Sequence, residues 1–236
     1  SYFFESFPDR SFEVGIAEAN AIGIAAGLSL SGFKPIISSF GSFLTGKNLE
    51  IRVSVAYNEA PVILVGTHGG LIGPDGATQS SIQDISVMRS IPKIKVFQPS
   101  TPIMTQKILR HSTLIDDPVY IRISRNEVPE IYDDNTDFIE GEPICIGKKS
   151  DIVIFSSGPI LHSCLTASIE LEKKHNLKTT VIDIPSIRPL NHQKIKQIVK
   201  GKRAIFTFED HVIEGGLGSA ILECISSEES NPRIFL

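Results

Sequence analysis

Short apolar runs alternate with longer mixed segments along the chain, and this alternation predicts the fold. In the first half, runs rich in β-branched residues predict strands at residues 34–40, 61–66, 93–98 and 118–124. The segments before and between them predict helices over about 15–30, 43–57, 80–90 and 102–112. Because the runs are almost continuously apolar and are separated by helices, they favour a parallel sheet covered on both faces.

The same alternation returns after an acidic segment. Residues 126–147 carry two prolines and several carboxylates, which is typical of a linker. Beyond it, strands are predicted at 151–158, 178–184, 203–210 and 233–236, with helices over about 159–175, 191–200 and 215–226. The predicted fold class is therefore α/β, with two parallel-sheet α/β domains. We expect the first domain to span residues 1–133 and the second 151–236, with a linker over 134–150.

Composition narrows the classes of function. Hydrophobic residues make up 41% and charged residues 21%, as in soluble globular proteins, and the net charge of −4 argues against a nucleic-acid partner. The three cysteines, Cys145, Cys164 and Cys224, have neither disulfide-framework nor metal-site spacing, which favours a reducing compartment. No apolar run reaches the roughly 20 residues of a membrane span, and the N-terminus lacks a secretory signal pattern. We therefore expect a cytoplasmic protein with no membrane partner.

One carboxylate interrupts the most apolar stretch of the chain. Residues 14–28 read VGIAEANAIGIAAGL, with Glu18 in their midst, and a helix this apolar is expected to be buried, at an interface or in the core. A lone ionised carboxylate there costs several kcal/mol unless it is paired or protonated, and such groups often have raised pKa values and catalytic tasks. The alternative is that Glu18 lies in the first turn of the helix and interacts favourably with its dipole.

Parallel sheets place their chemistry in the loops that follow the strands. Four such loops stand out, at residues 41–43, 67–79, 125–126 and 211–219. The second is rich in glycine and contains His68 and Asp75, although a long surface turn explains it equally well. The fourth contains GGLG, which lacks the full spacing of a dinucleotide-binding motif.

Ordered motifs over almost the whole chain resemble the thiamine-diphosphate enzymes of the transketolase group. This group includes transketolase, deoxyxylulose-phosphate synthase and the β subunits of 2-oxoacid dehydrogenases. The resemblance lies in residues 7–44, 53–100, 117–130, 182–191 and 209–223. The stretches GTHGG, DISVMRSIP and ISRN look most like transketolases of the split-subunit type. The resemblance identifies residues 1–133 as the pyrimidine-binding domain, whose N-terminal strand and helix are expected outside this sequence, and 151–236 as the C-terminal domain.

The resemblance implies where the cofactor lies on this chain. Glu18 matches the glutamate that contacts N1′ of the aminopyrimidine, where a carboxyl group in an apolar pocket shares a proton with the ring and activates the cofactor. Phe40 and Phe43 match aromatic residues that pack on the pyrimidine, although ordinary core packing is the alternative for both. A tyrosine often found one turn later is replaced here by Gly46, so the pocket is expected to be more open.

The resemblance also implies a substrate site. His68 matches a catalytic histidine that reaches the sugar phosphate or its hydroxyls, and Asp75 matches an aspartate that contacts a substrate hydroxyl. Arg125 matches a phosphate-binding arginine, with a surface salt bridge as the alternative. Gln79 stands where many transketolases have histidine, and an amide donates a hydrogen bond but does not titrate. This departure bears on which sugar is bound rather than on the cofactor.

One motif of the group is absent from this sequence. The resemblance implies a Gly-Asp-Gly motif and a later asparagine that hold Mg²⁺ and the diphosphate, and no such arrangement occurs here. No metal ligand is therefore assigned to this chain. Thiamine diphosphate and its Mg²⁺ or Ca²⁺ are expected to be held jointly with an N-terminal transketolase subunit that carries the diphosphate-binding domain, in an α2β2 assembly.

The predicted function is that of one subunit of a transketolase-like enzyme. Together with its partner it is expected to transfer a two-carbon ketol unit from a ketose phosphate to an aldose. One alternative is the β subunit of a 2-oxoacid dehydrogenase, which shares the domain order but has no need of a sugar-phosphate site. The other is a non-catalytic regulatory subunit, against which Glu18 argues.

Overall fold

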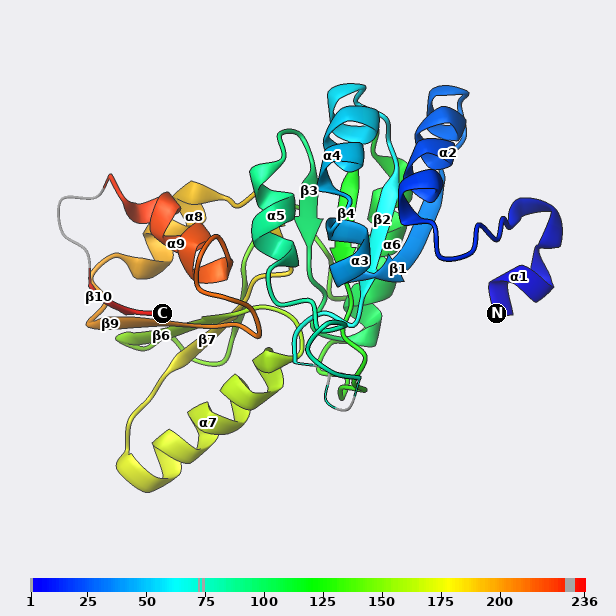
Figure 1. The fold of residues 1–236 in the computed structure, drawn as a ribbon. Helices are drawn as coiled ribbons and strands as arrows, with labels where there is room; N and C mark the ends of the chain where they lie inside the picture. The colour runs from blue at the N-terminus through cyan, green and yellow to red at the C-terminus, as the bar shows by residue number, and fades with distance from the viewer. Residues whose placement is uncertain (1, 72, 74, 228–231) are drawn as a thin grey trace.

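Two five-stranded sheets form the framework of the molecule (Figure 1). A computed structural model describes residues 2–71, 73, 75–227 and 232–236. The first sheet has the order β1-β2-β4-β3-β8, with bounds Ile36–Phe40, Ile63–Thr67, Val119–Arg122, Lys95–Phe97 and Ser186–Arg188. The second has the order β10-β9-β6-β7-β5, with bounds Arg233–Phe235, Ala204–Phe208, Ile152–Ser156, Thr180–Asp183 and Ile144–Ile146. The strand runs predicted from the sequence are all confirmed.

Each sheet is parallel except at one edge. β8 pairs with β3 in antiparallel orientation, and β5 pairs with β7 in the same way. β8 comes from the second half of the sequence but completes the first sheet, and β5 lies inside residues 134–150. The two halves are therefore joined by strand pairing as well as by the chain, while the division into domains at 134–150 stays a prediction.

Helices flank both sheets, except α1, which lies apart from them near the N-terminus (Figure 1). They are α1 Tyr2–Ser6, α2 Glu18–Leu30, α3 Gly41–Thr45, α4 Asn48–Glu50, α5 Asp84–Ser90, α6 Pro102–Leu114, α7 Ile160–His175, α8 His192–Val199 and α9 Leu217–Ile225. α7 packs on one side of the second sheet and α8 and α9 on the other (Figure 1). The helix predicted over 43–57 is instead broken into α3, α4 and a π-helix over Ile51–Tyr57.

The apolar helix α2 is buried on one face only. Ile22, Ala25 and Ala26 lie in the core, whereas Ile24 and Leu30 are exposed. The chain by itself therefore buries only one face of this helix, and burial of the other face at an interface stays a prediction. Small and apolar residues line both faces of this helix, so the composition alone does not predict which face packs against the rest of the chain.

A continuous apolar core joins the two halves. One cluster of buried residues includes Leu44 and Tyr120 of the first half together with Phe155 and Ile221 of the second. Because these side chains pack against common neighbours, the two sheets form one body and hold their loops in fixed relation. No helix in the described ranges combines the length and apolar character that a bilayer crossing requires.

Candidate functional site

The predicted site residues gather where three parallel strands end. β1, β2 and β4 are neighbours with parallel register, so their carboxyl ends lie at the same edge of the sheet. Phe40 is the last residue of β1, and His68 follows β2 directly. Arg125 lies three residues beyond the end of β4. The topology therefore brings together residues that are widely separated in sequence.

Glu18 is the first residue of α2 and is partly buried. Ser39 donates a hydrogen bond from Oγ to Glu18 Oε1 at 3.0 Å. Within the described part of the chain, no lysine or arginine pairs with this carboxylate. Its place in the first turn is also favourable for the helix dipole, so both interpretations offered by the sequence are compatible with the geometry.

Three rings stack on one another where β1 and β2 end. The rings of Phe40 and Phe43 lie 5.3 Å apart with an interplanar angle of 8°, and the rings of Phe40 and His68 lie 3.7 Å apart at 26°. His68 has a φ of +59°, a left-handed conformation that non-glycine residues seldom adopt. Backbone strain of this kind is found more often at functional sites than elsewhere. Phe43 keeps 40% of its surface exposed, which leaves an open aromatic face.

An ion pair closes the other side of His68. Arg125 Nη1 donates to Asp75 Oδ2, and the same oxygen lies 3.9 Å from His68 Nε2. Burial and the positive charge of Arg125 lower the pKa of His68, which favours the neutral imidazole. A neutral imidazole both donates and accepts hydrogen bonds, which suits a residue that contacts sugar hydroxyls.

Gln79 is held against α3 rather than against His68. Ser42 donates from Oγ to the backbone oxygen of Gln79 at 3.2 Å, and Thr78 donates to its side-chain Oε1 at 2.5 Å. The structure thus brings Phe40, Phe43, His68, Asp75 and Arg125 into contact with one another. Among the described residues, Glu18 is linked to this group through the hydroxyl of Ser39, which precedes Phe40 in β1. The chemical roles of all these residues stay predictions.

The residues present fit a planar heterocycle better than a metal ion. The Glu18 carboxylate supplies a partner for a ring nitrogen, and the exposed part of Phe43 supplies a surface for stacking. Over the described ranges, no three His, Cys, Asp or Glu side chains converge in a way that would hold a metal ion.

A buried ionic cluster below the site was missed by the sequence reasoning. Arg122 is 1% exposed and donates from Nε to Asp84 Oδ2 at 3.0 Å and from Nη1 to Asp210 Oδ1 at 2.6 Å. Tyr120 donates to Asp84 Oδ2 at 2.7 Å. Burial alone would lower the pKa of Arg122, but the carboxylates of Asp84 and Asp210 raise it above its ordinary value. A charged residue inside the otherwise apolar run PVYIRIS is the signal that could have revealed this cluster.

Comparisons with known proteins agree with this architecture. Two family descriptions match the chain: "Transketolase, pyrimidine binding domain" over residues 2–130 and "Transketolase, C-terminal domain" over residues 144–232. The chain is 35% identical over 226 residues to one subunit of the apulose-4-phosphate transketolase of Actinobacillus succinogenes, covering 95% of this chain and 72% of that protein. It is 31% identical over 228 residues to the 1-deoxy-D-xylulose-5-phosphate synthase of Desulfitobacterium hafniense, covering 96% of this chain but 36% of that protein.

Solved structures give the same result. A split-gene transketolase, described as an inactive β4 tetramer, matches with a TM-score of 0.90 and 34% identity, covering 99% of this chain and 76% of that one. A transketolase from Pichia stipitis matches with a TM-score of 0.72 at 21% identity, over 85% of this chain and 31% of that one, and supports the fold alone. The chain therefore belongs to the transketolase family, of which it carries the pyrimidine-binding and C-terminal domains.

Proposed function

We propose that this chain supplies the pyrimidine side of a thiamine-diphosphate site in a transketolase-like enzyme. The enzyme would transfer a two-carbon ketol unit from a ketose phosphate to an aldose. The proposal is carried by two neighbouring observations: Ser39 donates to the Glu18 carboxylate, and the ring of the next residue, Phe40, stacks on those of Phe43 and His68. Thiamine-diphosphate dependence is the property of the family to which the chain belongs.

Each residue on the cofactor side has a defined task in this proposal. Glu18 holds a proton on the nitrogen of the pyrimidine ring, and the Ser39 hydroxyl orients the carboxylate by donating to Oε1. Phe40 and Phe43 stack on the ring and exclude water from it. When bound, the cofactor itself supplies the carbanion chemistry by which the carbon–carbon bonds break and form.

The substrate side is built from the other predicted residues. His68 donates to or accepts from sugar hydroxyls as a neutral imidazole, and Asp75 accepts from a further hydroxyl. Arg125 binds the sugar phosphate with the N–H groups that Asp75 leaves free along the edge of its guanidinium, because this planar group suits bidentate phosphate binding. Gln79 contributes a hydrogen bond without a titrating proton, so proton transfer at this position is not expected.

The partner in this proposal is a chain that carries the diphosphate-binding domain and the Mg²⁺ or Ca²⁺ ion. Two names support this: one relative is named as a single subunit of its transketolase, and the solved split-gene transketolase is described as an inactive β4 tetramer. If the enzyme needs a second kind of chain for activity, an assembly of β chains alone is expected to be inactive. We propose an α2β2 assembly located in the cytoplasm.

The test combines the chain with a diphosphate-domain partner and measures thiamine-diphosphate-dependent turnover. Ribose 5-phosphate with a ketose phosphate donor is compared with a 2-oxoacid. We expect sugar turnover and a loss of about 100-fold or more in Glu18→Gln, because loss of a positioned proton donor or acceptor typically costs that much. Glu13→Gln, which removes a carboxylate five residues earlier that hydrogen-bonds Gly15 N at 2.9 Å, serves as the control and keeps its activity.

Two outcomes would replace the proposal. Turnover of the 2-oxoacid alone would favour a 2-oxoacid dehydrogenase β subunit. Unchanged turnover in Glu18→Gln would mean that this carboxylate serves only the helix, and a non-catalytic subunit would become the better interpretation.

A further inference from the structure

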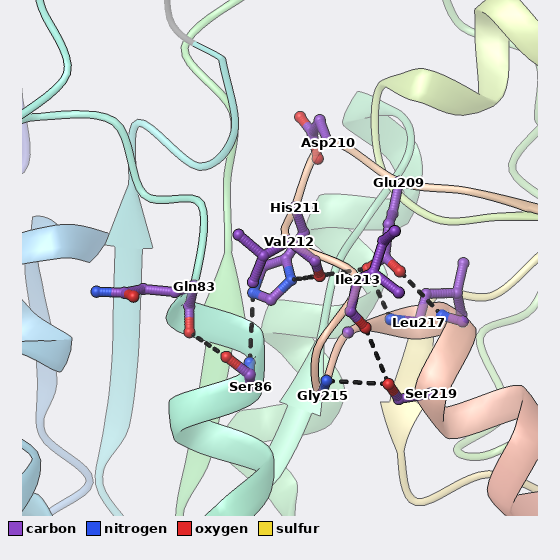
Figure 2. Close-up of polar contacts among 12 residues, drawn as sticks. Gln83, Ser86, Glu209, Asp210, His211, Val212, Ile213, Gly215, Leu217 and Ser219 are labelled. Atoms are coloured by element: carbon purple, nitrogen blue, oxygen red, sulfur yellow. Dashed lines mark hydrogen bonds and ion pairs between the residues drawn. The ribbon is translucent and has the colours of Figure 1, made fainter. Parts of the chain in front are cut away.

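The glycine-rich turn after β9 binds a carboxylate of its own chain. Residues 209–216, called the strap below, connect β9 to α9. Glu209 accepts hydrogen bonds from Leu217 N at 2.7 Å and from Gly218 N at 2.9 Å, at the first turn of α9 (Figure 2). A side chain on Gly216 would overlap this carboxylate. Since the helix N-terminus is already satisfied by Glu209, the strap is not arranged for a nucleotide phosphate.

The remainder of the strap lies against the first half of the molecule. Val212 donates from its backbone nitrogen to Ile82 O at 2.8 Å. His211 accepts at Nε2 from Ser86 N, 3.4 Å away in the first turn of α5, and lies 2.6 Å from Val212 O through Nδ1 (Figure 2). Because a carbonyl oxygen only accepts, Nδ1 carries the proton and Nε2 is free to accept. The strap thus makes specific backbone contacts with residues 82–86, immediately after the loop that carries His68, Asp75 and Gln79.

Asp210 extends these contacts beneath that loop. Its carboxylate accepts from Arg122 Nη1 at 2.6 Å, and its backbone oxygen accepts from Arg122 Nη2 at 3.1 Å. The same Nη2 donates to Ser81 O at 2.7 Å. Arg122 therefore connects the strap to the end of the loop. Both the carboxylate and the backbone oxygen of Asp210 accept hydrogen bonds from Arg122.

The two ends of the loop meet directly above this pair. Gly69 and Ser81 form a parallel bridge, and Gly70 N donates to Ser81 O at 2.8 Å. We call Gly69, Gly70 and Ser81 the loop base. A Cβ on Gly69 would lie 2.8 Å from Arg122 Nε, and one on Gly70, whose φ is +85°, would overlap the Asp210 carboxylate. The glycines let the loop base rest on the Arg122–Asp210 pair with no side chain between.

We propose that Asp210 is a positioning residue: through Arg122 it holds the loop base, and so the second half of the chain sets the geometry of the site in the first half. The loop base precedes or follows His68, Asp75 and Gln79 by a few residues, and Ser81 N donates to His68 O at 3.3 Å. A shift of the base therefore moves His68 away from Phe40. The functional consequence rests on the proposed function, but the positioning itself does not.

The test measures hydrogen–deuterium exchange in the full chain, with and without its partner. In Asp210→Ala we expect the loop-base amides of Gly70 and Ser81 to exchange roughly tenfold faster or more, while amides of β6 keep their rates. Asp210→Asn keeps an acceptor for Arg122 and should give a smaller increase, which provides a second variant if the alanine variant does not fold. Glu223→Ala is the control, because Glu223 pairs with Arg89 across the same two halves at 2.6 Å without touching the loop.

A spectroscopic measurement separates positioning from general destabilisation. The imidazole resonances of His68 should shift in both Asp210 variants, because its stacking on Phe40 changes, and should stay unchanged in Glu223→Ala. Unchanged His68 resonances and unchanged loop-base exchange in Asp210→Ala would overturn the proposal, as would equal changes in Glu223→Ala. Neither measurement needs turnover, so the positioning role can fail while the proposed function stands, or hold while the proposed function fails.

Discussion

Asp183 is a buried carboxylate, and its burial disfavours the charged form. It lies at the end of β7, is 0% exposed, and accepts at Oδ2 from Ser100 Oγ at 2.5 Å and from Tyr132 OH at 2.7 Å. Its Oδ1 has no hydrogen-bond partner among the described residues. Burial raises the pKa of Asp183 from an ordinary 3.8 to about 6, and the two hydroxyl donors offset only part of that rise. We predict that Asp183→Asn changes how stability depends on pH.

The sign and the size follow from proton linkage. Between the ordinary pKa and the raised one, the folded chain holds a proton on Asp183 that the unfolded chain has released. The free energy of unfolding therefore falls as the pH rises through this window, and the fall ends once the folded carboxyl ionises near pH 6. A shift of this size corresponds to roughly 3 kcal/mol. The asparagine variant has no proton to release, so it lacks this contribution.

The assay is urea unfolding of both proteins at pH values from about 4 to 7.5, followed by circular dichroism. The difference in unfolding free energy, Asp183→Asn minus wild type, should increase by roughly 2.5 kcal/mol from pH 4 to pH 7.5, because part of the linkage lies below pH 4. Any constant offset reports the altered hydrogen bonds to Ser100 and Tyr132. Asp151→Asn, at an exposed aspartate just before β6, should show a flat difference. A flat difference for Asp183→Asn as well would refute the reasoning.

Three further substitutions test the packing around the site, each measured by urea unfolding of the full chain. Gly70→Ala should destabilise by about 2 kcal/mol or more, because its backbone is left-handed and the new methyl group would displace Asp210; a neutral effect would mean that the loop base does not rest on that carboxylate. Leu44→Ala should cost roughly 2–5 kcal/mol, since the side chain is 0% exposed between α3 and the first sheet, and a loss below about 1 kcal/mol would contradict close packing there. Thr101→Ala should cost about 1 kcal/mol by removing the acceptor for Met104 N at 3.2 Å, and no loss would show that another group caps α6.

Much of the candidate site could be predicted because its residues follow strands. A run of apolar, β-branched residues is a local signal, and the edge at which parallel strands end is a consequence of topology. Phe43, His68 and Arg125 follow three such strands and were therefore expected at one edge, whereas Phe40 was expected there from the family resemblance. The ionic cluster of Arg122 and Asp210 was not, because the two residues are separated by 88 positions and nothing local links them.

The sequence by itself determined the strands, the approximate helices and the α/β class, because periodicity and turn residues act over a few positions. Only the tertiary structure decided that β8 crosses to the first sheet, that one face of α2 stays exposed, and that the strap holds the loop base. It also decided the pKa of Asp183. Nothing in the sequence distinguishes this aspartate, but segments distant in the chain bury it in the folded protein, and burial raises its pKa. Strand pairing, side-chain burial and charge compensation depend on contacts between groups that are far apart in the sequence. These contacts form only in the folded chain, so local sequence patterns do not predict them.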